Sequence, residues 1–235
     1  MYGLSYKLGY MVNALVFDSF ALIWFPFIFG IKEEERVKFM MRKVLSYFTF
    51  GVSFISLGVA LFSREVVYVM ASEEFFEAHR AIPLIVLGYV FWAIYQITST
   101  TLYLRERTGT LSMLVLIAAV ANVVLNAILV PSFSYDGAAW ATVGTFVVLA
   151  VSCWVVSERE MRVSYEIWRV LLPIVVGLGL YSLGYVIPDG SIAWNLGLKA
   201  ALCAAFPLIL LTFGYFTKEE RFRGFRWIGR RLAEL

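Results

Sequence analysis

The sequence predicts an all-α protein that crosses a membrane about seven times. Its 235 residues are 61% hydrophobic and 16% charged, with a mean hydropathy of +0.79, and a soluble domain of this size could not bury so much apolar surface. A helix needs about 20 mainly apolar residues to cross a hydrocarbon core of roughly 30 Å. Seven stretches meet this requirement, at approximately 4–30, 44–63, 81–104, 111–130, 137–156, 170–187 and 192–216.

The gaps between these stretches alternate between basic gaps and gaps nearly free of Lys and Arg. Sixteen of the 20 basic residues fall in the first, third and fifth gaps and in the C-terminal tail, and the other four are Lys7, Arg64, Arg80 and Lys199. Because basic loops stay on the cytoplasmic side, we predict an outside N-terminus and a cytoplasmic C-terminus in a multi-pass protein of the plasma (inner) membrane. The net charge of +3 then needs no nucleic-acid partner, since the basic residues can contact anionic membrane lipids.

Two regions are expected along the chain. Residues 1–216 form the seven-helix transmembrane lobe, and residues 217–235 form a basic amphipathic cytoplasmic tail. In the tail, the aromatic and aliphatic residues would share roughly one face of a helix, which is typical of a helix lying in the membrane interface. The segment 32–43 has a similar pattern, and we expect a second, shorter interfacial helix there.

The first stretch carries polar residues that are costly inside a membrane, namely Lys7, Asn13 and Asp18. Two interpretations remain open. In one, these residues form a stripe that faces a translocation cavity, where Asp18 binds a cation or proton or pairs with a basic residue. In the other, Lys7 extends to the outer interface and Asp18 makes a structural hydrogen bond or is protonated. Lys199 in the last stretch is either a second cavity residue or another side chain that extends outward.

Other residues within the spans predict close helix packing. Asn122 and Asn126 share one face of the fourth span and are expected to form hydrogen bonds between helices. Gly137, Ala138 and Ala141 begin the fifth span, where small side chains let neighbouring helices approach closely.

Pro26 lies near the end of the long, aromatic-rich first span. A proline inside a helix removes one backbone hydrogen bond and can kink the helix. We therefore predict that Pro26 is a hinge.

The sequence argues against an enzyme. It has no Gly-rich phosphate loop, no HExxH or GxSxG motif and no acidic pair of the DxD kind, and its gaps are too short to hold a catalytic domain. Cys153 and Cys203 lie inside spans and His79 is the single histidine, so no metal site is predicted.

One junction resembles a specific membrane protein family. Residues 122–131 read NVVLNAILVP, and residues 136–142 read DGAAWAT. This resembles the N-x-x-L-N-x-x-L-I-P…G-A-A-x-A-T junction of the polysaccharide and O-antigen (Wzx-type) flippases. Further matches to that family follow its order and bring the resemblance to nearly the whole chain, at Tyr2–Leu8, Trp24–Phe27, Phe62–Ala78 and Leu102–Thr108. The family belongs to the multidrug/oligosaccharidyl-lipid/polysaccharide exporter superfamily, which also holds the multidrug and toxin extruders and the lipid II flippase.

The resemblance implies that this chain is the C-terminal half of a two-lobe exporter, corresponding to helices eight to fourteen. We therefore expect a fragment, a split subunit or a mis-called start, with an N-terminal lobe or partner subunit completing the cavity. The implied cargo is a lipid-linked oligosaccharide carried on polyprenyl diphosphate for polysaccharide biosynthesis. No cofactor is expected beyond proton or sodium coupling, for which Asp18 is the candidate residue.

Two other functions are left open. A cation-coupled multidrug exporter of the same superfamily would have an acidic and aromatic cavity, and Asp18 with Phe17, Phe20 and Trp24 fits this loosely. A non-transporting membrane scaffold subunit would require only the packing residues.

Overall fold

The computed structural model describes residues 13–70, 79–186 and 191–216, and every regular element in these ranges is a helix. In chain order the elements are η1 (Asn13–Asp18, a π-helical turn), α2 (Ser19–Phe29), α3 (Glu34–Leu61), α4 (Ser63–Met70), α5 (Ile82–Leu104), α6 (Thr108–Met161), α7 (Ile167–Val186) and α8 (Ile192–Thr212). Five of them are long and apolar enough to cross a membrane, and Val16–Phe29 is a shorter apolar helix. The prediction of an all-α membrane fold is therefore confirmed. The predicted tail helix lies outside the described residues.

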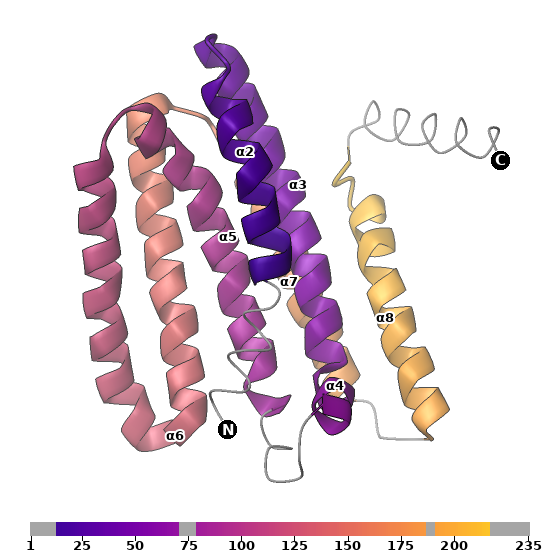
Figure 1. The fold of residues 1–235 in the computed structure, drawn as a ribbon. Coiled ribbons are helices and arrows are strands. Elements are labelled where there is room, and N and C mark those ends of the chain that lie inside the picture. The colour runs from indigo at the N-terminus through magenta and orange to yellow at the C-terminus, as the bar shows by residue number, and fades with distance from the viewer. Residues whose placement is uncertain (1–12, 71–78, 187–190, 217–235) are drawn as a thin grey trace, which may run out of the picture.

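α6 is a helical hairpin. Its 54 residues would extend about 80 Å as one straight helix, far beyond the thickness of a bilayer. The chain folds back at Ser134, whose backbone angles (φ 53°, ψ −127°) are not helical, and Figure 1 shows the two arms side by side. We call residues 108–133 the first arm and residues 135–161 the second arm. With both arms counted, and with η1 and α2 taken together, the described helices other than α4 correspond to the seven predicted stretches.

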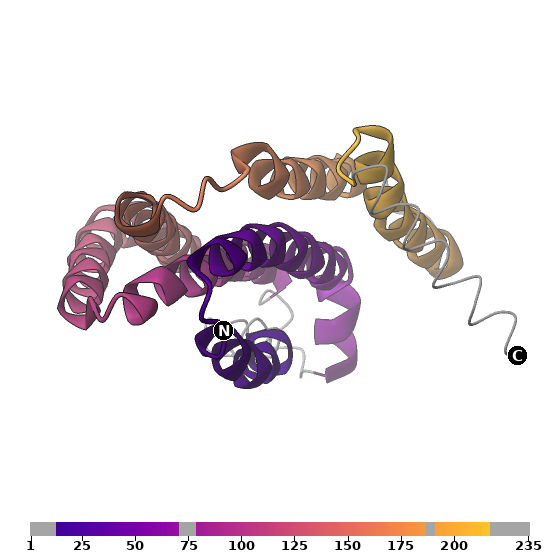
Figure 2. The same cartoon turned by 90° about the horizontal axis from the view of Figure 1, so that it is seen from above.

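α3 is at the centre of the lobe. Seen from above, α2 lies on one side of α3 and α7 lies on the other (Figure 2). The largest group of buried apolar side chains joins these helices to α5 and the second arm, and it includes Trp24, Met41, Ile97, Leu149 and Val170. Because lipid offers no hydrophobic drive between helices, this close packing is what holds them together.

The three basic connections lie at the same end of the molecule. Figure 1 shows the α2–α3, α5–α6 and α6–α7 connections together at its upper end. Arg42 of α3 donates a hydrogen bond of 3.0 Å to the carbonyl of Val163 in the α6–α7 connection. Glu158, near the end of α6, accepts hydrogen bonds from two backbone N–H groups of the same connection, those of Ser164 (3.1 Å) and Tyr165 (2.9 Å). The charge pattern thus marks one end of the lobe, and its assignment to the cytoplasm stays a prediction.

α3 begins ten residues before the predicted span. The expected separate interfacial helix at 32–43 is wrong, because this segment continues into the first turns of α3. Acidic residues in a first helical turn favour the helix dipole, and Glu34 and Glu35 occupy that turn. Lys38 also forms ion pairs with Glu34 (3.0 Å) and Glu35 (2.8 Å) along the helix surface. These local interactions carry the helix beyond its membrane-spanning part.

The first arm of α6 exposes most of its apolar side chains. Only 11% of its most apolar window is buried, and Met113, Leu116, Val123 and Ile128 are each more than 60% exposed. Such an exposed apolar surface is suited to contact with lipid or with further apolar helices.

Candidate functional site

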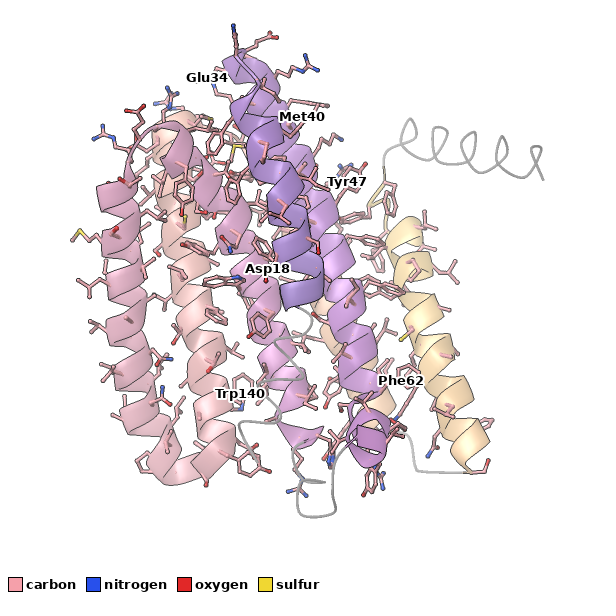
Figure 3. The ribbon with its side chains drawn as sticks, viewed as in Figure 1. Asp18, Glu34, Met40, Tyr47, Phe62 and Trp140 are labelled. Carbon is pink, nitrogen blue, oxygen red and sulfur yellow. The ribbon has the colours of Figure 1, made fainter. Side chains whose placement is uncertain are left out.

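The candidate site is the uncovered face of α2, which carries Asp18. Asp18 is the last residue of η1 and its side chain is exposed. Figure 3 places it at the end of α2, at a height between Tyr47 and Phe62 of the neighbouring α3. Leu22 (78% exposed) and Ile23 (75% exposed) continue the same uncovered face. A carboxylate therefore lies near mid-span on a surface that the described helices of the lobe leave open.

The opposite face of this helix is held firmly against the lobe. Phe20 stacks on Phe48 of α3 with ring centroids 4.3 Å apart and on Trp24 at 5.7 Å. The indole N–H of Trp24, which is 4% exposed, donates a hydrogen bond of 3.1 Å to Thr100 of α5. Because aromatic packing and a buried hydrogen bond fix this face inward, Asp18 is directed outward.

Any partner of Asp18 lies outside the described residues, either elsewhere in this chain or beyond it. Within the described residues it forms no hydrogen bond or ion pair, and it sits at the junction between a π-helical turn and α2. Insertion scales put an aspartate at a helix centre at about 2.5–3.5 kcal/mol, so such residues face a protein interior or water rather than lipid. π-helical turns are also frequent at functional positions. The arrangement can bind a cation, exchange a proton or pair with a basic side chain.

The other predicted cavity residues are not brought to this face by the described part of the structure. Lys7 lies outside the described residues, and the side chain of Asn13 is not described. Lys199 of α8 is paired with Glu65 of α4, with 2.5 Å between the amine and a carboxylate oxygen. Its assignment to a cavity stays a prediction.

The predicted packing residues meet in the α6 hairpin. Asn122 of the first arm donates a hydrogen bond of 2.9 Å to the hydroxyl of Thr145 in the second arm. Asn126 donates back to the backbone carbonyl of Asn122 at 2.9 Å and to its side-chain oxygen at 3.2 Å. The hydroxyl of Thr145 in turn donates to the carbonyl of Ala141 at 2.7 Å. The Asn122–Thr145 bond joins the two arms, and the other bonds hold its two side chains in place within their own arms.

The small residues lie where the hairpin turns. A β-carbon at Gly137 would stand 2.3 Å from the carbonyl oxygen of Leu129, so only glycine fits there. The carbonyl of Ala138 accepts a hydrogen bond of 3.0 Å from Thr142, and Ala141 is completely buried. Close approach of the arms therefore depends on small side chains.

Pro26 is exposed and lies inside α2, where the backbone remains helical. The amide of Gly30, four residues later, donates to the carbonyl of Pro26 at 3.2 Å. The proposed hinge function of Pro26 stays a prediction.

A buried hydroxyl cluster was missed from the sequence. Thr98, Ser99, Thr100 and Thr101 of α5 are all fully buried. The hydroxyl of Ser157 in the second arm donates to Thr101 at 2.7 Å. The signal was present as the run TSTT at 98–101, because four consecutive hydroxyl residues in an apolar span mark a polar contact between helices.

A cavity of about 310 Å³ lies between α3, α5 and α7, with Trp140 of the second arm at its edge. Ser53, at its wall, has a buried hydroxyl with no partner among the described residues. The lining is otherwise mainly apolar and includes no charged side chain. This cavity can hold an apolar group but offers nothing to neutralise a diphosphate.

Comparison with known proteins supports the fold. No family model and no curated protein sequence matches the chain. Among solved structures it is similar to the lipid II flippase MurJ in an inward closed conformation, with a TM-score of 0.56 and 14% sequence identity. The alignment covers 88% of this chain and 47% of MurJ, so the chain spans less than half the length of that protein. The helical arrangement described above is thus a MurJ-like fold.

Proposed function

We propose that this chain supplies one lobe of a flippase that moves polyprenyl-diphosphate-linked oligosaccharide across the plasma membrane for polysaccharide biosynthesis. The observation that carries the proposal is Asp18, which lies near mid-span on the uncovered face of α2. The MurJ-like fold supports the general kind of function, and the resemblance of residues 122–142 to polysaccharide flippases supports the oligosaccharide cargo.

In the proposed mechanism, the uncovered face of α2 forms half of a cavity, and a second set of helices closes the other half. Two lobes then rock about a central site and expose it to each side of the membrane in turn. The sugar and diphosphate enter the polar cavity while the polyprenyl chain remains in lipid. Within the described residues, Lys199 and Arg169 are paired with Glu65 and Glu166. We therefore expect the second set of helices to supply the cations that bind the diphosphate.

Asp18 is proposed to couple this cycle to protons or sodium ions. Moving one charge across 100 mV is worth about 2.3 kcal/mol, which corresponds to roughly fiftyfold in an accumulation ratio. An Asp18→Asn variant keeps the size of the side chain but loses the charge. We therefore expect it to reach the membrane and to lose most surface polysaccharide in the native cell.

The matched control is Asp136→Asn, which makes the same chemical change at the α6 turn, away from α2. Membrane immunoblots would show that both variants are produced equally. If Asp18→Asn left transport and its ion dependence unchanged, the coupling role would be abandoned. If the variant instead reduced dye efflux while surface polysaccharide stayed normal, the function would be drug export.

The multidrug alternative has weaker structural support. It requires aromatic side chains beside Asp18 in the cavity, yet Phe17 and Trp24 are 5% and 4% exposed and contact the lobe's own core. On the uncovered side of α2, Leu22 and Ile23 are the most exposed side chains near Asp18, and the exposed aromatic residues, Phe27 and Phe29, lie nine and eleven residues further along the chain.

A further inference from the structure

α8 is fastened to the rest of the lobe unequally at its two ends. In Figure 1 it leans away from α3 toward its first residues. Its fully buried side chains, Phe206 and Leu210, lie in its second half. Most of its first half is therefore not packed against the bundle.

The C-terminal end of α8 is held by buried aromatic contacts. Tyr215, just beyond the helix, is 1% exposed, and its hydroxyl donates a hydrogen bond of 2.6 Å to the carbonyl of Ser46 in α3. Its ring lies 5.8 Å from that of Phe50, and the guanidinium of Arg169 lies 5.9 Å from its centroid. Packing, a hydrogen bond and a cation–π contact converge at this one residue.

The other end is held by an ion pair. The Lys199 amine of α8 reaches Glu65 of α4 across 134 residues of chain, and both side chains remain partly exposed, at 18% and 31%. The second carboxylate oxygen of Glu65 is buried without a hydrogen-bond partner among the described residues. Apart from this ion pair, none of the described side chains in the first half of α8 is fully buried, so this end is held by fewer buried contacts than the Tyr215 end.

Gly184 of α7 lets α3, α7 and α8 approach one another closely near this ion pair. A β-carbon on Gly184 would stand 2.8 Å from Leu61 of α3 and 3.1 Å from Leu202 of α8. Leu202 lies three residues after Lys199 in α8, and Leu61 ends α3 four residues before Glu65 of α4. Near the ion pair, α8 thus approaches α3 and α7 closely at Gly184.

We propose that α8 is a hinged strap that turns about Tyr215 and is latched by Lys199 and Glu65. When the latch opens, the first half of α8 swings away from the corner formed by α3 and α4, while the Tyr215 end stays in place. Lys199 acts in this device as a latch residue between helices, independently of any cargo.

Distances between spin labels would test the strap in the full chain, reconstituted in nanodiscs of phosphatidylethanolamine and phosphatidylglycerol. One pair of labels, at Val69 of α4 and Leu196 of α8, reports on the latch, and both positions are exposed. A second pair, at Tyr47 and Phe213, reports on the hinge, and these positions are also exposed. The native cysteines are first replaced by alanine so that only the chosen sites are labelled.

For the unmodified latch we expect one narrow distance distribution at each pair. Lys199→Met should add a longer and broader population at the latch pair and leave the hinge pair unchanged. Lys199→Arg and the charge exchange Glu65→Lys with Lys199→Glu should both restore the narrow distribution. Lys38→Met, which breaks a surface ion pair on α3, is the matched control and should change neither pair.

Two results would overturn the proposal. An unchanged latch distance in Lys199→Met would mean that packing alone fixes α8. Broadening at both label pairs would mean that α8 detaches as a whole and has no hinge at Tyr215. The charge-exchange variant keeps the test decisive if Lys199→Met alone fails to fold.

Discussion

Replacing Gly137 by alanine should weaken the α6 hairpin. The added methyl group would stand 2.3 Å from the carbonyl oxygen of Leu129, 2.6 Å from its carbonyl carbon and 3.0 Å from the amide nitrogen of Val130. All three are backbone atoms, so no side-chain rotation relieves the clash and the arms must separate. Overpacking of this kind costs about 1–3 kcal/mol, and we expect the upper half of that range.

This loss of unfolding free energy can be expressed as a shift in melting temperature. For a chain of this length, 1 kcal/mol shifts Tm by about 2–4 °C, so Gly137→Ala should lower Tm by roughly 4–12 °C. Gly51 in α3 is the matched control, because a β-carbon there meets no atom within 4 Å. Alanine is favoured over glycine within a helix by about 0.5–1 kcal/mol, so Gly51→Ala should raise Tm slightly.

The assay is thermal unfolding followed by tryptophan fluorescence, with both variants in the same detergent micelles. The two substitutions are chemically identical, and the structure alone gives their effects opposite signs. If Gly137→Ala were as stable as Gly51→Ala, the close approach of the hairpin arms at Leu129 would be refuted.

Two further predictions concern the uncovered face of α2 and the first turn of α3. A photo-crosslinking amino acid at Ile23, which is 75% exposed, should couple to protein. The same amino acid at Val123 of α6, which is 68% exposed, should couple only to lipid. Lipid adducts at both sites would contradict a protein-lined cavity. The side-chain hydrogen bond from Lys38 lowers the pKa of Glu34, so this pair stabilises the fold above the ordinary glutamate pKa and loses its effect as the pH falls through the lowered value. A carbon-13 NMR titration of the Glu34 carboxyl should therefore show its pKa rising toward the ordinary value in Lys38→Met, and an unchanged pKa would disprove the interaction.

The sequence predicted the membrane helices well because the bilayer imposes a length that composition reveals. The predicted spans 81–104 and 170–187 differ little from α5 and α7. The start of α3 was missed because residues 34–43 are held by Glu34, Lys38 and their neighbours, and hydropathy does not register ion pairs along a helix. α4 was missed for a related reason, since eight residues are too few to give a span signal.

The candidate site could be predicted only in part. Asp18 could be singled out because a carboxylate within an apolar run is recognisable from the sequence alone, and placing such a charge in a membrane is costly. Which way Asp18 faces depends on contacts from Phe20 to Phe48 and from Trp24 to Thr100, 76 residues away. Such contacts between distant segments leave no local pattern, and for the same reason the pairing of Lys199 with Glu65 could not be foreseen.

The bare first arm of α6 has a consequence for how this protein can change over generations. Where neighbouring side chains interlock, shape restricts which residues are accepted. Where the neighbour is fluid hydrocarbon, valine, leucine, isoleucine and methionine can replace one another at little cost, provided no charge enters. Long stretches of such a chain can drift through equivalent apolar residues while the backbone stays in place. Very different apolar sequences can therefore build one helix arrangement, in keeping with a TM-score of 0.56 at only 14% identity.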